Sequence, residues 1–548
     1  MTHSQKRTIL FAVLALVAAA LVFFIVKATA ANTAGTPTVS ADSADTSTSD
    51  STAASTLSAA SAEFVFSDSG IAVTGSSSGT EINGTALTID EAGTYTVSGA
   101  CADGSIKIKK GTTGVTLILN GLDLTSSATA PITCAKLSGV AILAADGTEN
   151  ALTDSAQNND GEYPENTDAE NAVIKCKDGS TVTLCGAGSL TVNANGKNGI
   201  KSGATTDEEG EASLTIEELT LTISASVGDA INAEQTLNIP SGALTISAAD
   251  DAIHADYELN VGADSTDGPS ITITDCYEGL EAATLNVFSG NIDITATDDC
   301  LNAANADLSG YDFTMNVSGG TIRAYTSGGD GFDSNGDLTI SGGTVVVWTA
   351  NGADNQPLDA DGTITVTGGT VLAAGGSSGM GMNLSAAQPY VTFGSSTMGG
   401  FGSFGGGKMQ PPNGERPDDM PELPDGTQPS DRTPPDGTQQ PGDMGTPPDG
   451  FGDFGGFGGT ALVAKGSTLT ITSGSDTLFS ETAPCDVRFV FYSAPELTDG
   501  ESYTLNADAE TAETAEAQTG ETQTGFGGKP TGDPPARPDG EAPTEQPT

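Results

Sequence analysis

The sequence predicts an all-β protein that forms a right-handed parallel β-helix, a solenoid of stacked coils. A five-residue motif recurs along the chain, and most copies are separated by 21–31 residues, a spacing typical of stacked repeats. Between the motifs lie short apolar runs with a glycine corner, such as Leu338–Ile340 and the Gly-Gly-Thr that follows, and helical periodicity is absent. Three short strands per repeat make one coil, and crossovers between parallel strands are nearly always right-handed.

The motif consists of an acidic residue, a small residue, a large apolar residue, a polar residue and a second small residue. We expect the apolar residues to point inward and stack, because a single coil cannot bury its own apolar face. The polar residues that follow then point outward, since side chains alternate along a strand. The predicted inward stack contains Ile132, Ile174, Ile200, Ile231, Ile253, Leu280, Leu301, Phe332, Leu358 and Met382, and the outward column contains Lys201, Asn232, His254, Glu281, Asn302, Asp333, Asp359 and Asn383.

The acidic residues that begin the motif predict a metal site. If the coils stack, these carboxylates lie roughly 4.8 Å apart, and unscreened like charges at that distance repel each other. Two interpretations are open, because acidic residues also favour corners that face water. Their recurrence in five coils favours bound cations, and calcium accepts irregular cages of oxygen ligands. The predicted ligands are Asp229, Asp250, Asp251, Glu278, Glu281, Asp298, Asp299, Asp330 and Asp333.

Charge and residue usage narrow the class of partner. The formal net charge is -53, from 72 acidic and 19 basic residues, which argues against nucleic acid because phosphate contacts need clustered lysine and arginine. One histidine lies outside the N-terminal segment, and acids in every coil single out no carboxylate pair, so no catalytic residue is predicted. The side chains predicted to contact a sugar are His254, Tyr257, Tyr277, Asn302 and Trp348.

The composition divides the chain into six segments. Residues 1–30 include Lys6-Arg7 and an apolar run from Ile9 to Val26, which predicts either a cleaved signal peptide or an uncleaved transmembrane anchor. Both interpretations place the following residues outside the cytoplasm. The other segments are a disordered stalk (31–62), the β-helix (63–394), a low-complexity Gly/Pro-rich insertion (395–458), a closing β segment (459–506) and a disordered tail (507–548).

Seven cysteines are present, without the spacing of a zinc site. Cys134 and Cys176 occupy the same motif position, where other copies carry alanine or serine. They are either small inward side chains or a stacked disulfide, which an extracytoplasmic setting would permit.

Four stretches carry a family resemblance. They are Asp250–Ala255 (Asp-Asp-Ala-Ile-His-Ala), Tyr277–Ala282, Asp298–Ala303 and Leu338–Thr344. Together they resemble the clostridial-type carbohydrate-binding β-helix proteins of the bacterial cell surface, over about residues 64–394 and again over 460–505. The resemblance implies bound calcium, in sites similar to those of pectate lyases with the same fold, and affinity for plant-type or acidic polysaccharides. The chain departs from the family pattern at Cys300, where glycine is usual.

We therefore expect a monomeric, non-catalytic protein that binds polysaccharide with calcium at the bacterial cell surface, either secreted or anchored by its N-terminal segment. A calcium-dependent polysaccharide lyase of the pectate type is the alternative, and it would need a basic residue such as Lys197 or Lys201 near the acids. A structural adhesin or spacer without sugar affinity is the second alternative.

Overall fold

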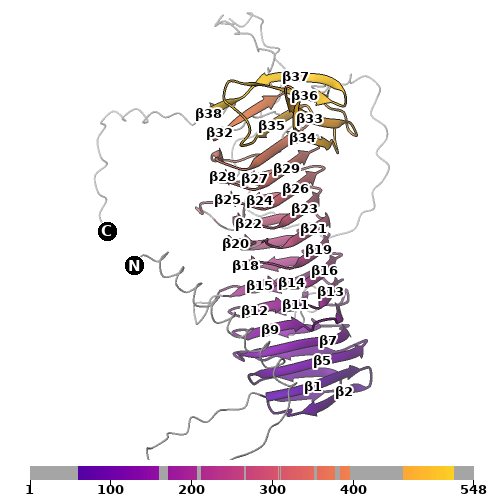
Figure 1. The fold of residues 1–548 in the computed structure, drawn as a ribbon. Helices are drawn as coiled ribbons and strands as arrows, with labels where there is room; N and C mark the ends of the chain where they lie inside the picture. Colours follow the sequence, from indigo (N-terminus) through magenta and orange to yellow (C-terminus); the bar gives the residue numbers. More distant parts are fainter. Residues whose placement is uncertain are drawn as a thin grey trace, which may run out of the picture. The chain divides into compact units, whose positions relative to one another are not determined.

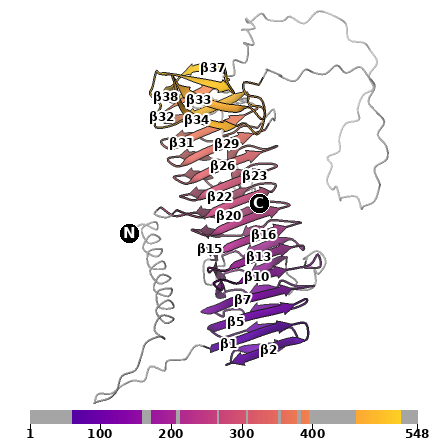
Figure 2. The same cartoon turned by 45° about the vertical axis from the view of Figure 1, so that its right-hand side comes forward.

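The computed structural model describes residues 60–158, 171–205, 212–264, 267–305, 308, 310–350, 355–376, 383–394 and 461–523. These residues form strands and no helix, and most strands belong to one large sheet in which successive coils pair in parallel (Figure 1). The sheet winds as a solenoid with three stacks of strands, which lie one above another like rungs in Figure 2. The predicted all-β solenoid is confirmed, whereas its right-handed winding stays a prediction.

The first stack carries outward asparagines and is called the asparagine stack. Asn238, Asn260, Asn286 and Asn316 follow one another in register, and the side-chain nitrogens of the last three each donate to the side-chain oxygen of the asparagine in the preceding coil at 3.0–3.1 Å. The strands are β1 (Ala60–Ser67), β5 (Gly93–Cys101), β7 (Val115–Thr125), β9 (Gly139–Ala144), β12 (Thr181–Cys185), β15 (Ser213–Glu217), β18 (Thr236–Ile239), the second parts of β20 (Ile253–Val261) and β22 (Leu280–Val287), β25 (Thr314–Val317), β28 (Asp337–Ile340), β30 (Ile364–Val366) and β32 (Asn383–Phe393).

The second stack presents outward threonines and is called the threonine stack. Thr191, Thr222, Thr245 and Thr272 lie in register between buried aliphatic residues. After the ends of β5 and β7, its strands are β10 (Glu149–Thr153), β13 (Ser189–Ala194), β16 (Thr220–Ala225), β19 (Ala243–Ala248), β21 (Ser270–Asp275), β23 (Asn291–Ala296), β26 (Thr321–Thr326), β29 (Thr344–Thr349) and β31 (Thr370–Gly375).

The third stack contains the repeated motif and is called the motif stack. Ile253, for example, pairs with Ile231 in the coil before it and with Leu280 in the coil after it, and all three are fully buried. The same register runs from Ile132 to Leu358, as the alternation within the motif predicts. Its strands are β4 (Ala86–Ile89), β6 (Ser105–Ile108), β8 (Ile132–Cys134), β11 (Ala172–Cys176), β14 (Asn198–Ser202), β17 (Ile231–Ala233), the first parts of β20 and β22, β24 (Leu301–Ala303) and β27 (Phe332–Ser334).

One predicted member of the motif stack is wrong. Asn383 lies in β32, where its neighbour Leu384 pairs with Ile364 of the asparagine stack. The motif-like stretch before it includes Met382, which lies outside the described residues. Cys134 and Cys176 pair in register as buried free thiols, and all seven cysteines are free.

Gly-Gly-Thr corners make the turn from the asparagine stack to the threonine stack. Gly320, Gly343 and Gly369 have φ values of 83°, 83° and 84°, a left-handed conformation that residues with a Cβ rarely adopt. A Cβ at Gly343 would lie 2.7 Å from the carbonyl oxygen of Gly320 in the preceding coil. Glycine is therefore required both by the backbone conformation and by the close stacking of the coils.

Antiparallel strands close both ends of the solenoid. Near the N-terminal end, β2 (Gly70–Gly75) pairs with β1, and β3 (Thr80–Asn83) pairs with β4. At the C-terminal end, β35 (Phe489–Ser493) pairs with β31 and β32, and β38 (Gln518–Gln523) pairs with β32. A separate four-stranded sheet is formed in the order β34 (Asp476–Thr482), β33 (Thr468–Ser473), β36 (Ser502–Ala507) and β37 (Glu510–Glu516).

Two predicted segment boundaries are wrong. The stalk was expected to continue to residue 62, but β1 begins at Ala60. The disordered tail was expected from residue 507, but β37 and β38 occupy most of residues 510–523. Both strands are polar, and backbone hydrogen bonds to β36 and β32 rather than a large apolar core hold them in place.

The predicted N-terminal segment (1–30), the stalk up to residue 59 and the insertion (395–458) lie outside the described residues. Within the part of the chain that the structure describes, no helix is long and apolar enough to cross a membrane.

The inward stack predicts how the protein responds to core truncation. Ile253→Ala should lower the free energy of unfolding by about 2–5 kcal/mol, because it leaves a cavity between two stacked neighbours. Thr245→Ala, on the exposed face of the adjacent threonine stack, should change it by less than about 0.5 kcal/mol. Urea unfolding followed by circular dichroism measures both, and equal losses for the two variants would contradict the assigned register.

Candidate functional site

Backbone hydrogen bonds place the five motif acids in one row at the corner that enters the motif stack. The amide nitrogen after each acid donates to the carbonyl oxygen of the acid in the next coil. Ala230 donates to Asp251 at 3.0 Å and Ala252 donates to Glu278 at 2.9 Å, and the pattern continues to Asp299 and Asp330. The row is therefore a consequence of coil stacking and does not depend on attraction between the side chains.

Several of these carboxylates also bond to the backbone of the next coil. The Oδ1 atom of Asp229 accepts from the amide of Asp251 at 3.2 Å, and Oδ1 of Asp299 accepts from the amide of Asp330 at 2.6 Å. Asn198 occupies the same place in an earlier coil and accepts from the amide of Asp229 at 3.1 Å. Because asparagine can perform this structural role, the negative charge is not needed for it.

Asp330, Asp333 and Asp359 form the first group that could hold a metal ion, here called the Asp330 cluster. Each offers a carboxylate oxygen, and these oxygens all lie within 4.8 Å of one another. In the described part of the chain, no lysine, arginine or histidine forms an ion pair with them. Burial, with a contribution from neighbouring carboxylates, raises the pKa of Asp330 to about 7 and that of Asp333 to about 6.

Asn302 provides an oxygen next to this cluster. It pairs in register with Glu281 on one side and with Asp333 on the other, and only 8% of it is exposed. Its amide nitrogen donates to Oε2 of Glu278 at 2.9 Å, whereas its buried Oδ1 atom has no hydrogen-bond partner. Carboxylate and amide oxygens are the ligands that calcium prefers, so this donor set fits a calcium ion.

A second group contains Asp229, Asp250 and Asp251 and is called the Asp229 cluster. Its carboxylate oxygens also lie within 4.8 Å of one another. The Oδ2 atom of Asp229 accepts a hydrogen bond from the side-chain amide of Asn232 at 2.5 Å, so both carboxylate oxygens of Asp229 accept hydrogen bonds. Burial raises the pKa of Asp250, and the charge of Lys197 partly opposes that rise. The Asp229 cluster is thus partly neutralised by the protein itself.

His254 joins Asp251 and Glu281 in a third group, but it acts there as a cation. Its Nδ1 atom contacts Glu281 and lies 3.5 Å from Asp251, and its Nε2 atom lies 2.9 Å from Asp256. Burial alone would lower the pKa of His254, but hydrogen bonds to these three carboxylates raise it to about 12. The imidazolium therefore provides the positive charge at this coil.

Glu278, Asp298 and Asp299 lie on the same corner but outside the three groups. Burial raises the pKa of Glu278 to about 8 and that of Asp299 to about 7. Tyr277 is exposed, and a hydrogen bond to Asp298 raises the pKa of its hydroxyl to about 12.

One predicted sugar contact is wrong. Trp348 is only 5% exposed, because it packs in the apolar cluster beneath the C-terminal four-stranded sheet. A tryptophan with no free ring face cannot stack on a sugar. Conversely, Asp359 was missing from the predicted ligands although it stood in the outward column, because Gln356 replaces the acid that begins its copy of the motif.

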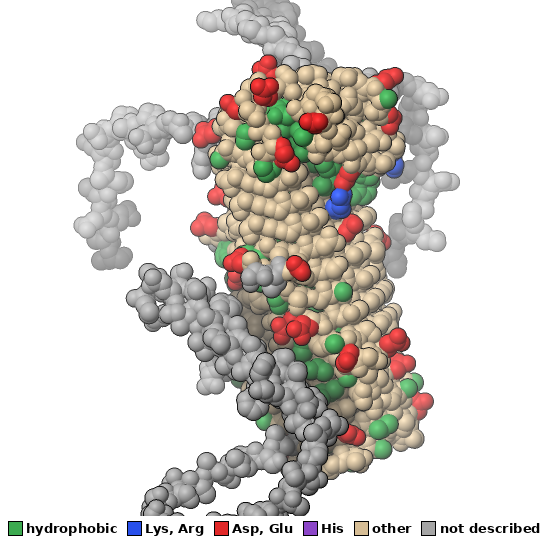
Figure 3. Space-filling view, viewed as in Figure 1, with side chains coloured by type: hydrophobic (Ala, Val, Ile, Leu, Met, Phe, Trp, Pro, Cys, Tyr) green, Lys and Arg blue, Asp and Glu red, His purple; other side chains and the backbone are tan. Residues whose placement is uncertain are grey.

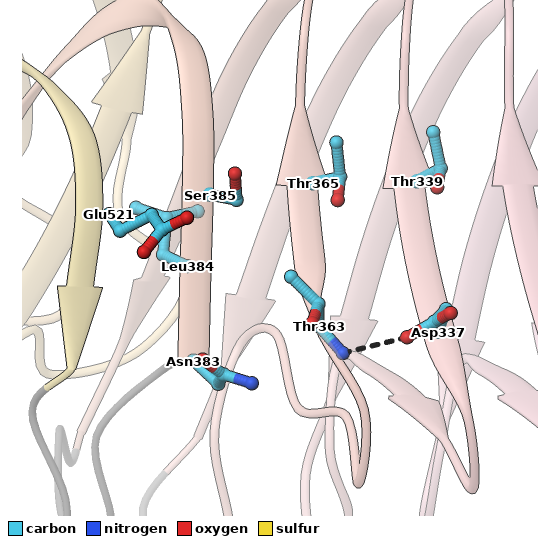
Figure 4. Close-up of a pocket in the computed structure, with 8 residues that line it drawn as sticks. All are labelled: Asp337, Thr339, Thr363, Thr365, Asn383, Leu384, Ser385 and Glu521. Atoms are coloured by element: carbon cyan, nitrogen blue, oxygen red, sulfur yellow. Dashed lines mark hydrogen bonds between the residues drawn. The ribbon is translucent and has the colours of Figure 1, made fainter.

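A groove of about 460 Å³ lies on the asparagine stack near its C-terminal end. Thr339, Thr365 and Ser385 line it in register, and Figure 4 shows their side chains side by side on neighbouring strands. The amide of Thr363 donates to Oδ1 of Asp337 at 2.9 Å at one end of the groove. The remaining lining residues are Asn383, Leu384 and Glu521.

In the space-filling view of Figure 3, acidic groups far outnumber basic ones on the visible face.

The fold and this corner define a parallel β-solenoid with a row of half-buried acids. The chain belongs to the family described as carbohydrate-binding domain-containing proteins, whose family model matches residues 83–379. A protein of that description from Acetivibrio thermocellus is 40% identical over 113 residues, which is 20% of this chain and 38% of the relative. A solved structure, the polysaccharide lyase-like protein from C. thermocellum, is 23% identical and has a TM-score of 0.33, covering 56% of this chain and 96% of its own.

The raised pKa values predict a pH-dependent stability in the absence of divalent cations. The folded protein keeps protons on Glu278, Asp299 and Asp330 up to pKa values of about 8, 7 and 7, whereas the unfolded chain loses them near their ordinary values of 4.5 and 3.8. The folded state thus binds more protons than the unfolded state in this window, so the free energy of unfolding should fall as pH rises from about 5 to 8. Because its pKa is raised, His254 acts in the same direction above its ordinary value of 6.5.

Thermal unfolding in chelator across this pH range measures the effect. The double variant Asp299→Asn, Asp330→Asn should flatten the curve, because asparagine keeps the oxygen that accepts the backbone amide but carries no titratable proton. A midpoint that rises toward pH 8 would contradict the assigned burial of these acids.

Proposed function

We propose that this protein binds polysaccharide with the help of calcium and does not cleave it. Membership of the carbohydrate-binding family supports the sugar as ligand. The observation that carries the calcium proposal is the Asp330 cluster, three half-buried carboxylates that have no cationic partner among the described residues and that lie beside the unpartnered Oδ1 atom of Asn302. The predicted N-terminal segment would place this activity outside the cytoplasm, at the cell surface.

In this proposal the residues of the Asp330 cluster and Asn302 hold the ion. The bound ion would supply the positive charge that the row lacks and could attract the carboxylate of an acidic sugar. The protein itself positions the carboxylates, because the ladder of backbone hydrogen bonds fixes the residues that carry them. Burial removes water that would otherwise screen their charges. The Asp229 cluster is a second candidate calcium site, where the positive charge of Lys197 would compete with the ion for the carboxylates.

A calcium-dependent lyase is the second candidate function. One observation favours it, namely that Lys197 lies close enough to Asp250 to influence its pKa. A lyase would need a base near the cation-bound uronate, and a lysine beside the Asp229 cluster is a possible source of one. The recurrence of acids in coil after coil favours binding along a surface over chemistry at one point.

Calcium binding is expected to depend on Asp333. Asp333→Ala should remove about one calcium ion per protein, because one of three carboxylates leaves the Asp330 cluster. Equilibrium dialysis against calcium measures the stoichiometry, and the gain in melting temperature on adding calcium gives a second readout. Asp293→Ala, which removes an exposed acid from the threonine stack, should leave both values unchanged. Equal stoichiometry in all three proteins would reject these ligands.

Glycan binding is expected to require the ion. On a glycan array the full protein should bind acidic polysaccharides in calcium, and chelator should reduce the signal by at least about tenfold, as expected when an opposite charge is lost. Absence of glycan binding under both conditions would favour a structural spacer. Incubation with polygalacturonate tests the lyase, and unsaturated product that accumulates with time and is lost in Lys197→Ala would overturn the non-catalytic proposal.

A further inference from the structure

The connection between β24 and β25 is one of the two longest that lead from the motif stack to the asparagine stack, together with the one between β14 and β15 (203–212). It spans residues 304–313, whereas the connection between β17 and β18 consists of Glu234 and Gln235. Part of this connection reaches back two coils, because the side-chain amide of Asn305 donates to the backbone carbonyl of Asp256 at 3.0 Å. It thereby brings residues of a later coil against the start of the second part of β20, which belongs to the asparagine stack.

Three aromatic rings meet there. The ring centroids of Tyr257 and Tyr311 are 6.3 Å apart at an interplanar angle of 73°, and those of Tyr311 and Phe313 are 5.6 Å apart. The hydroxyl of Tyr311 lies 3.1 Å from that of Thr284, which fixes the ring in place. Tyr311 is nevertheless 37% exposed and is one of six large hydrophobic residues exposed among those the structure describes.

A β-bulge directs Tyr257 toward this group. In β20 the register shifts between Ala255 and Glu258, so that Asp256 and Tyr257 face a shorter segment of β22. Bulges of this kind re-aim side chains and are common beside functional sites. Here Asp256 contacts His254 and the next residue, Tyr257, contacts Tyr311.

The aromatic group ends at Phe313, close to one end of the groove shown in Figure 4. The amide of Asp337 donates to the backbone carbonyl of Phe313 at 3.2 Å, so Phe313 lies one coil before the first strand of the groove, and Tyr257 lies two coils before Phe313. The groove itself offers hydroxyls, an amide and carboxylates, from Thr339, Thr365, Asn383, Asp337 and Glu521. An aromatic wall along earlier coils is therefore followed, one coil after Phe313, by polar groups suited to a polyhydroxylated ligand, and the groove's volume falls within the range of ligand sites.

We propose that Tyr257, Tyr311 and Phe313 form a stacking wall for a pyranose ring and that the groove binds the hydroxyls of the adjoining sugars. The C–H face of a pyranose is apolar and its rim is polar, which matches a ring face followed by hydroxyl and carboxylate groups. The proposal deepens the proposed function, on which it rests, by assigning the glycan contact to a surface separate from the Asp330 cluster. The glycan chain would run along the asparagine stack, parallel to the axis of the solenoid.

Calorimetric titration of the full protein at saturating calcium, with hexagalacturonate and with cellohexaose, tests this assignment. Tyr311→Ala should weaken binding of the sugar by about tenfold, because a stacked aromatic surface is lost. Thr365→Val should weaken it by about fivefold, because one hydrogen bond to a hydroxyl is lost at constant shape. Both variants should retain the calcium stoichiometry of the wild type.

Two matched variants serve as controls. Tyr311→Phe keeps the ring, and Thr245→Val makes the same exchange as Thr365→Val on the exposed threonine stack, so both should bind within about twofold of the wild type. If the wild type binds and Tyr311→Ala and Thr365→Val bind equally well, the groove is rejected while the proposed function stands. If the wild type binds neither hexasaccharide, the proposed function fails and the groove assignment fails with it.

Discussion

The backbone register of the motif stack is the constraint on which the rest of this structure depends. Each amide after a motif acid donates to the carbonyl of the acid in the next coil, so the acids must lie in one row whatever their charges prefer. The stacked inward residues that flank the row, such as Ile253 and Leu280, are fully buried and provide the free energy that holds this arrangement. Electrostatic repulsion is therefore imposed by the fold and has to be relieved locally.

The chain relieves this repulsion differently along the row. The N-terminal coils carry cationic side chains, since Lys201 forms an ion pair with Glu234 at 2.8 Å and the charge of Lys197 partly opposes the rise in the pKa of Asp250 that burial causes. In the middle, His254 is the cation among three carboxylates. For Asp299, Asp330 and Asp333, burial is the main cause of the raised pKa values, and the charges that add to the rise come from other acids. The C-terminal coils are thus where an ion from solution has most to neutralise.

The features that the sequence could predict are those set by local pattern. The alternation within the motif is enough to orient Ile231 and Asn232 oppositely, and the repeat spacing is enough to stack them with later copies. The burial of Trp348 could not be predicted in this way, because the residues that cover it lie more than 100 positions later in the C-terminal sheet. The grouping of aromatic rings around Tyr311 could not be predicted from the local pattern either, because it depends on a long connection that contacts a strand two coils earlier.

The position of that connection explains how a solenoid of this kind can acquire a binding surface. Corners lie outside the pairing of the strands, so they can lengthen without disturbing the register on which the core depends. The same corner joins the two proposed sites. In each of two coils an acid of the Asp330 cluster lies at the end of the motif-stack segment, and a groove residue lies four positions later, near the start of the asparagine-stack strand. The pairs are Asp333 with Asp337 and Asp359 with Thr363. An ion that fixes the Asp330 cluster would therefore order the strands that line the groove, and the calcium dependence that we propose for glycan binding needs no direct contact between ion and sugar.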